Sequence, residues 1–154
     1  MSRRAARPAA WVCLLGMAVA ARGAPPDPVR QLVEDVAAAA EDRDAESVLS
    51  RLAPSFRGTG GLDRAAVGAE LRRYFALYSG LDVTLSDVEV EPEDEGARAR
   101  FRADLSGRPK DLPGVEGLLP RASAFRFDVR AVPAADGWTI GSAEWERVEL
   151  PAEP

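Results

Sequence analysis

Two stretches of this chain alternate strictly between apolar and charged residues, and this alternation restricts the fold more than any other feature. In residues 97–105 the apolar positions are Ala97, Ala99, Phe101, Ala103 and Leu105, and the positions between them carry Arg98, Arg100, Arg102 and Asp104. Residues 122–132 repeat the pattern, with Phe125, Phe127, Val129 and Ala131 set against Arg126, Asp128 and Arg130. A period of two places successive side chains on opposite faces of a strand. The pattern therefore predicts a sheet with one apolar face, which helices should cover, and one charged face in water.

The same period extends over most of the C-terminal half. Residues 82–91, 97–105, 122–132 and 138–150 are predicted to form four antiparallel strands. The breaks at 93–96 and 134–137 suit hairpin turns, whereas residues 107–120 make a longer excursion.

Two irregularities in this pattern predict bulges. Val83 and Leu85 differ in parity from Val88 and Val90, so a bulge is expected near Ser86 and Asp87. The orientation of Asp87 is left open by this interruption. Trp138 and Trp145 also have opposite parity, so both can face the core only if Gly141 or Ser142 forms a bulge.

Helical periodicity precedes the strands. Asp27 is expected to cap a first helix with Pro28 at its first position. The apolar face of that helix comprises Val29, Leu32, Val33, Val36, Ala37 and Ala40. Asp44 is expected to cap a short second helix, which carries Val48, Leu49 and Leu52 and which Pro54 ends.

A third helix is predicted from Asp63, as its cap, to a stop at Gly80. Tyr74 and Tyr78 would then lie four residues apart on its apolar side. The glycine-rich segment 57–61 lacks a following Gly-Lys-Ser/Thr, so it is interpreted as a turn between two helices and not as a phosphate site.

The N-terminus has the pattern of an export signal. Arg3, Arg4 and Arg7 precede an apolar run at 9–21 that is too short to span a bilayer, and cleavage after Ala21 or Gly23 fits the small-residue rule. We expect residues 1–24 to be a signal peptide, 25–150 one domain and 151–154 a disordered tail. The mature product would be periplasmic or secreted and without a stable membrane span, while the export pathway, general or twin-arginine, is left open.

Much of the usual catalytic chemistry is missing from this sequence. It contains no histidine, and its one cysteine, Cys13, lies within the predicted signal. Imidazole bases, Ser-His-Asp and Cys-His nucleophiles, zinc sites built on His or Cys and disulfides are thereby excluded, and no catalytic residues, metal or cofactor are predicted. The net charge of −5, which loss of the signal's arginines would make more negative, argues against nucleic acid as a partner.

The order of elements resembles the nuclear transport factor 2-like (NTF2-like) superfamily, which includes SnoaL-like cyclases and ketosteroid isomerases. Two local features add to the likeness: the polar break 41–45 before Val48 and Leu49, and the Gly-Trp turn within residues 136–140. The resemblance implies an α+β fold, in which N-terminal helices pack on a strongly curved antiparallel sheet to form a cone. It also implies a cavity between sheet and helices and, in the enzymes, a carboxylate base with a Tyr or second acid, or a His-Asp pair. The His-Asp pair cannot be formed here.

Aromatic residues near the expected cavity are the binding candidates. The predicted ligand-pocket residues are Tyr74, Tyr78, Phe101, Phe125, Phe127 and Trp145. The apolar residues of the excursion, which would form a lip over the cavity or a dimer contact, are Leu112, Val115, Leu118 and Leu119. Packing in a filled core would explain the aromatic residues equally well. Asp104 and Asp128 share a face with the arginines, where ion pairs across the strands are expected.

These observations favour an exported, non-enzymatic domain that binds a small apolar ligand or a protein partner. One alternative is an isomerase or cyclase that uses carboxylate proton transfer, which requires a buried acid near Tyr74 or Tyr78. The other alternative is a structural module that forms a homodimer through its charged sheet face.

Overall fold

A computed structural model describes residues 26–115 and 117–152 of the chain. The elements, in chain order, are α1 (Pro26–Glu41), α2 (Ala45–Ser50), β1 (Leu52–Gly58), the 3-10 turn η1 (Thr59–Gly61), α3 (Arg64–Ala76), β2 (Tyr78–Glu93), β3 (Gly96–Pro109), β4 (Ala122–Ala134) and β5 (Gly137–Val148). The predicted signal peptide lies outside the described residues.

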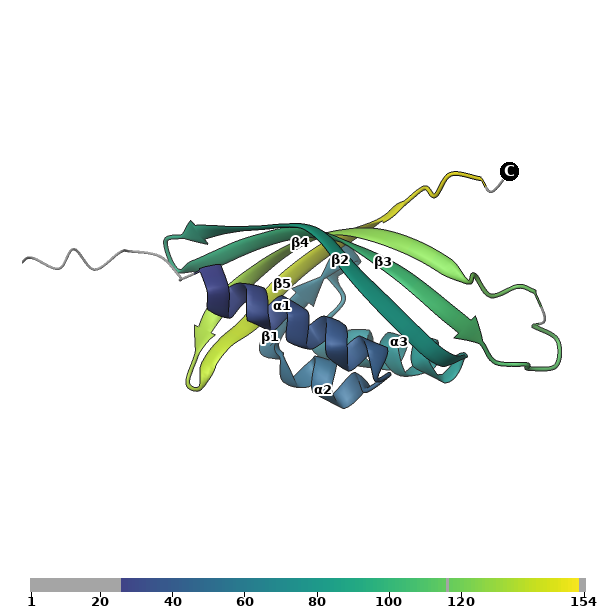
Figure 1. Cartoon of the computed structure of the whole chain (residues 1–154). Coiled ribbons are helices and arrows are strands. Elements are labelled where there is room, and N and C mark those ends of the chain that lie inside the picture. Colours follow the sequence, from purple (N-terminus) through teal and green to yellow (C-terminus); the bar gives the residue numbers. More distant parts are fainter. Residues whose placement is uncertain (1–25, 116, 153–154) are drawn as a thin grey trace, which may run out of the picture.

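One curved sheet forms the main layer, and the helices pack against its concave side (Figure 1). The strand order is β1-β5-β4-β3-β2, and the pairs β2–β3, β3–β4 and β4–β5 are antiparallel. The predicted α+β architecture and its four antiparallel strands are therefore confirmed. The concave side carries the apolar residues of β3 and β4, as their alternation predicts.

Strand β1 was not predicted, and it makes the sheet mixed because it pairs in parallel with β5. The expected second helix is shorter than predicted and ends at Ser50, before Leu52 enters the strand. Pro54 is tolerated because β1 lies at the edge of the sheet and its pairing with β5 is interrupted between Leu52 and Arg57. The glycine-rich segment 57–61 consequently joins a strand to a helix, not two helices.

The helix ends agree in part with the sequence. Asp44 accepts a hydrogen bond from the backbone N–H of Ser47 at 3.1 Å, and Asp63 accepts one from that of Ala66 at 2.8 Å, so both predicted caps are confirmed. Helix α1 begins at Pro26, which places Asp27 in its first turn and not at the cap.

The C-terminal end of α3 requires a further correction. The helix stops at Ala76, ahead of the predicted stop at Gly80, and Tyr78 begins strand β2. Pairing with Pro109 on β3 holds Tyr78 in the sheet. Tyr74 and Tyr78 are therefore not on the same helix.

Both predicted bulges are present. The β2–β3 register shifts between Ser86 and Glu89, and Asp87 has a φ of 52°. In the β4–β5 pair, Arg130 faces Ser142 and Ala131 faces Ile140, which leaves Gly141 as the extra residue. Trp138 and Trp145 consequently both pack against the core.

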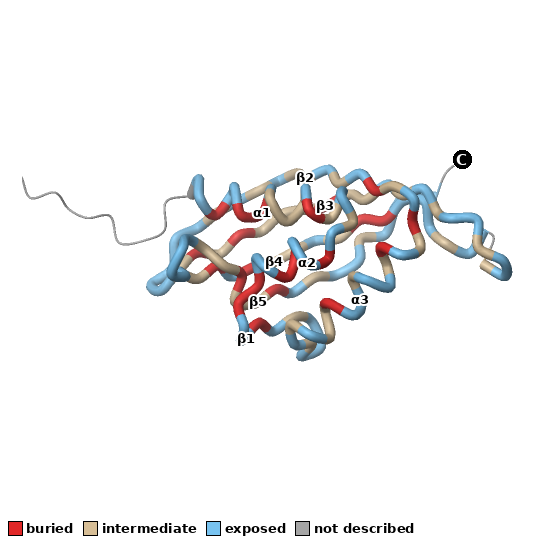
Figure 2. The backbone as a smooth tube through the Cα atoms, turned by 90° about the horizontal axis from the view of Figure 1, so that it is seen from below, coloured by how far each residue is buried: buried red, intermediate tan, exposed pale blue. Residues whose placement is uncertain are grey.

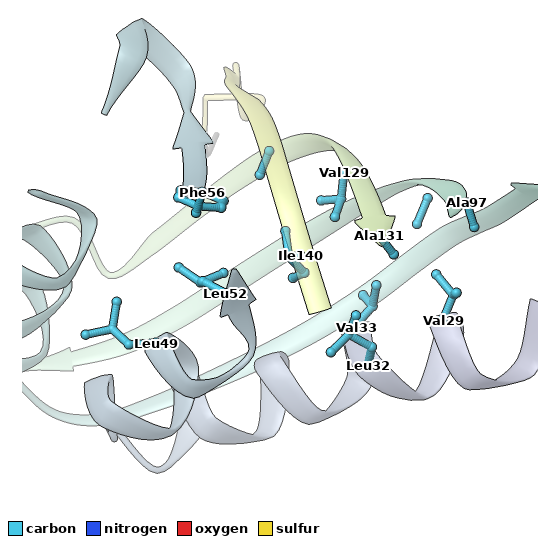
Figure 3. Close-up of a cluster of buried hydrophobic side chains, with 12 residues drawn as sticks. Val29, Leu32, Val33, Leu49, Leu52, Phe56, Ala97, Val129, Ala131 and Ile140 are labelled. Carbon is cyan, nitrogen blue, oxygen red and sulfur yellow. The ribbon is translucent and has the colours of Figure 1, made fainter. Parts of the chain in front are cut away.

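Buried side chains form two clusters. In the first, Val29, Leu32 and Val33 of α1 point toward the concave face of the sheet (Figure 3). The second joins the helices to the start of β2 and comprises Ala39, Ala45, Val48, Phe75, Tyr78 and Leu81. Complete burial of one apolar side chain, such as that of Val29, stabilises the fold by about 1.5–3 kcal/mol. Figure 2, seen from the helix side, shows buried residues recurring along the central strands. No helix of the described residues is long and apolar enough to cross a membrane.

Candidate functional site

Four aromatic side chains lie together on the concave side of the sheet. Phe101 on β3 pairs with Phe127 on β4, which in turn pairs with Trp145 on β5, and Phe125 lies two residues before Phe127 on the same face. The ring centroid of Phe127 lies 5.1 Å from that of Phe101, 6.3 Å from that of Phe125 and 6.3 Å from that of Trp145. All four side chains are only partly buried. We call Phe101, Phe125, Phe127 and Trp145 the aromatic face.

The position of Trp145 is fixed from the β1 side of the sheet. A side chain at Gly58 would place its Cβ 2.7 Å from Cη2 of Trp145, so the indole packs directly on the glycine backbone. The backbone N–H of Trp145 donates to Oγ1 of Thr59 at 2.8 Å. The unexpected strand β1 and the turn after it therefore hold one end of the aromatic face in place.

Arg147 occupies the next inward position on β5, directly opposite Phe125. Its Nη2 donates to Oγ of Ser123 at 3.4 Å, and Ser123 is only 6% exposed. The Arg147 side chain is itself exposed and takes part in no ion pair among the described residues. The aromatic face thus ends in the guanidinium of Arg147 and the hydroxyl of Ser123, neither of which is among the residues predicted from the sequence.

Tyr74 approaches this polar end from α3. Its ring centroid lies 4.9 Å from that of Tyr78. Burial, and then the neighbouring Tyr78, raise the pKa of Tyr74 to about 12, while Arg147 acts on it in the opposite direction. The Tyr74 hydroxyl is consequently neutral at physiological pH.

Tyr78, the other predicted tyrosine, lies in the core. It is 1% exposed, and its Oη donates to the backbone carbonyl of Pro120 at 2.8 Å. A Cβ at Gly107 would lie 2.6 Å from its ring. The structure therefore gives Tyr78 a packing role and a contact with the 110–121 loop, and does not place it on the aromatic face.

The predicted lip residues lie in this loop, which extends beyond the ends of β3 and β4 (Figure 1). Leu119 packs against the second core cluster, Leu112 and Val115 are half-buried, and Leu118 is 74% exposed. The backbone N–H of Lys110 donates to the carbonyl of Leu77 at 2.8 Å and so ties the loop to the end of α3. Whether the loop covers a bound molecule stays a prediction.

Ion pairs occupy the opposite, convex face, as the arginine alternation predicts. Asp128 pairs with Arg98, and Asp104 pairs with Arg102 at 2.7 Å. The hydrogen bonds from these arginines hold the pKa of both aspartates below the usual range. Asp87 lies in the bulge of β2 and is exposed. Among the described residues, no Asp or Glu is buried, and the polar groups of the buried core are the hydroxyls of Ser123 and Tyr78.

Two hollows on the surface lie away from the aromatic face. One of about 330 Å³ is lined by Asp42, Arg43, Ala45, Arg72, Phe75, Ala76 and Lys110. Another of about 410 Å³ is lined by Ser50, Arg51, Leu52, Pro54, Arg64, Ala134, Asp136, Trp138 and Thr139. None of the predicted pocket or lip residues lines either hollow.

Solved structures with this architecture are numerous, although no family model and no curated protein matches the sequence. A proposed aromatic ring hydroxylase from Novosphingobium aromaticivorans is similar at a TM-score of 0.66 and 20% identity, over 81% of this chain and 90% of that one. A proposed dehydratase of the NTF2-like family from Streptomyces avermitilis is similar at 0.64 and 17%, over 81% and 96%. The protein Bd1075 from Bdellovibrio bacteriovorus matches at 0.65 and 14%, over 80% of this chain but only 41% of that one. These likenesses show the NTF2-like cone fold.

Proposed function

We propose that this NTF2-like cone domain binds a small apolar molecule on its aromatic face and performs no chemistry on it. The observation that carries the proposal is the set of four adjacent, partly exposed rings on the concave side of the sheet. Adjacent aromatic side chains with open surface are typical of ligand sites, because they offer large apolar area with little loss of rotamer freedom.

The expected affinity is modest. A ligand that buries about 200 Å² of apolar surface gains roughly 5 kcal/mol before the entropy of association is subtracted. A dissociation constant of about a millimolar is therefore expected for a probe of naphthalene size.

The carboxylate-base alternative has less support. It requires a buried acid, and the described residues include none. Tyr74, whose pKa is raised to about 12, would remain protonated at neutral pH and could not act as a base. For these reasons we propose binding and not catalysis.

Fluorescence titration with N-phenyl-1-naphthylamine, an uncharged apolar probe, tests this function. We expect the wild-type protein to bind the probe and Phe125→Ala to weaken binding about tenfold, because Phe125 belongs to neither core cluster and can be removed without unfolding the domain. Leu150→Ala, at an exposed apolar residue beyond β5, is the matched control and should bind like the wild type. Absence of probe binding by the folded wild-type protein would contradict the proposal.

A protein partner or a second copy is the alternative occupant of the same face. Sedimentation of the wild type and of Phe125→Ala distinguishes a small-molecule site from a contact between two copies of the chain. A monomer in both supports the small molecule, whereas a dimer that Phe125→Ala dissociates supports the second copy.

Export is a separate part of the proposal, and it depends on the basic and apolar pattern of residues 1–24. The test is expression of the full chain in a bacterial host, followed by mass spectrometry of the periplasmic fraction. A mature N-terminus at Arg22 or Ala24 is expected. A full-length protein that remains in the cytoplasm would contradict export without affecting the binding proposal.

A further inference from the structure

We infer that the molecule bound on the aromatic face is an anion, an aromatic or apolar carboxylic or sulfonic acid whose charged group binds Arg147. This inference depends on the proposed binding function and specifies the chemical class of its ligand.

Arg147 is joined to the aromatic face by the strand itself. It lies two residues after Trp145 and opposite Phe125, so its side chain projects on the same concave side as the rings. Two residues of strand span about 7 Å, which is close to the length of a bicyclic ring system. A ligand stacked on Phe127 and Trp145 would therefore place a substituent of its ring within reach of the guanidinium.

Five arginines on the convex face of the sheet contrast with Arg147. On the convex face, Arg98, Arg100, Arg102, Arg126 and Arg130 each form an ion pair with a carboxylate of this chain. Within the described part of the chain, Arg147 makes only one long hydrogen bond, to the neutral hydroxyl of Ser123. Most of its N–H groups therefore remain available to a ligand, and a guanidinium binds a carboxylate or sulfonate through two parallel hydrogen bonds.

The groups around Arg147 favour a negative charge over a positive one. Ser123 offers a hydroxyl that is almost fully buried, and the Tyr74 hydroxyl lies near enough for Arg147 to influence it. The Ser123 hydroxyl can donate to an anion. Because no carboxylate among the described residues is paired with Arg147, a cationic ligand would meet an uncompensated like charge.

Two probes of similar shape test the inference on the folded protein. 8-Anilinonaphthalene-1-sulfonate carries a sulfonate beside its rings, whereas N-phenyl-1-naphthylamine is the uncharged counterpart. We expect Arg147→Gln to weaken binding of the sulfonate about tenfold and to leave binding of the uncharged probe within about twofold. Arg147→Lys, which keeps the charge but not the paired hydrogen bonds, should give an intermediate loss.

Arg126→Gln is the matched control, because it removes the same charge from the convex face of the neighbouring strand. It should leave both affinities unchanged. Raising NaCl from about 0.05 to about 0.5 M should weaken binding of the sulfonate and should not weaken binding of the uncharged probe. Near-ultraviolet circular dichroism of each variant confirms that the probes report on folded protein.

The outcomes distinguish failure of the anionic-ligand inference from failure of the proposed binding function. If the uncharged probe binds but Arg147→Gln affects the two probes equally, or affects neither, the anionic ligand is excluded while the binding function stands. If Arg126→Gln weakens binding of the sulfonate as much as Arg147→Gln does, the effect is due to the overall charge of the protein, and Arg147 is not a specific anion site. If neither probe binds the folded wild type, the binding function fails and this inference fails with it.

Discussion

The rings of Phe101 and Phe127 stack across β3 and β4, with centroids 5.1 Å apart and planes 13° from parallel. The two residues are direct cross-strand partners, so the register of the sheet sets the overlap of their rings. Such a pair contributes about 0.5–1.5 kcal/mol beyond its burial of apolar area. Because both side chains are only partly buried, the stack is held rigidly and still presents apolar surface on the concave side.

The phenylalanines of this fold should differ in their effect on stability. Phe56 on β1 is 1% exposed, so Phe56→Ala should lower the free energy of unfolding by about 3–5 kcal/mol. Phe125→Ala removes a half-buried ring outside both core clusters and should cost less than about 2 kcal/mol. Urea denaturation measures both values. Equal losses would mean that the aromatic face is part of the core.

Tyr78 is expected to anchor the 110–121 loop. Tyr78→Phe removes the hydrogen bond from its Oη to the carbonyl of Pro120, at a cost of about 1 kcal/mol. Hydrogen exchange at residues 117–121 should accelerate, while exchange in the centre of β3 should not change. Ser106→Ala, at an exposed residue of β3, is the control. Unchanged exchange in the loop would show that other contacts hold it.

Gly107 should tolerate no side chain, because the ring of Tyr78 occupies that space. Gly107→Ala would place a Cβ 2.6 Å from the ring and should destabilise the fold by about 1–3 kcal/mol. Ser106→Ala, one position earlier on the exposed face, should have little effect on the thermal midpoint. A neutral effect of Gly107→Ala would contradict the close packing of Tyr78.

Asp128 should contribute to stability except in acid. The hydrogen bond from Arg98 keeps its pKa below the usual range, so this contribution is present above about pH 4 and is lost as the pH falls through the lowered pKa. Asp128→Asn should therefore flatten the decline of unfolding free energy in acid. Glu144→Gln, at an exposed acid on β5, should leave that decline as in the wild type. If the unfolding free energy declined in acid to the same extent in both variants, the Asp128–Arg98 pair would not be the cause of the decline.

Tyr74 should contribute to stability except at high pH, which is the opposite of the pH dependence expected for Asp128. Its raised pKa of about 12 in the fold, against 10.0 for a free tyrosine, means that its contribution is complete below pH 10 and is lost between pH 10 and 12. Tyr74→Phe should remove part of this loss, which alkaline urea titrations measure. The ultraviolet absorbance of the wild type should show a tyrosine that ionises late. Ionisation of every tyrosine near pH 10 would contradict the burial of Tyr74.

The antiparallel half of the fold could be predicted because its strands are half-buried, which leaves the alternation of Phe101 and Phe127 with arginines visible in the sequence. Strand β1 could not, because Leu52 and Phe56 are four residues apart and fit a helix as well as a strand. The deciding contact is distant: the carbonyl of Arg51 accepts from the backbone N–H of Ile140 at 2.8 Å. Local propensity contains no information about such a pairing.

The candidate site was predicted in its apolar part and missed in its polar part. The aromatic face comprises four of the six predicted pocket residues, while Tyr78 was misplaced because α3 ends before it. Arg147 and Ser123 were overlooked, although each lies two residues from a predicted aromatic residue, Trp145 or Phe125. Their parity was a usable signal, but only after the Gly141 bulge had placed Trp145 on the concave side.

Intermolecular nuclear Overhauser effects between N-phenyl-1-naphthylamine and the protein's aromatic protons test the binding site most directly. We expect contacts from the probe to the rings of Phe101, Phe127 and Trp145, because these rings are direct neighbours on the aromatic face. Trp138, which lines a hollow elsewhere, serves as the internal control and should show none. Contacts confined to Trp138 or to the 110–121 loop, with none to the aromatic face, would contradict the proposed site.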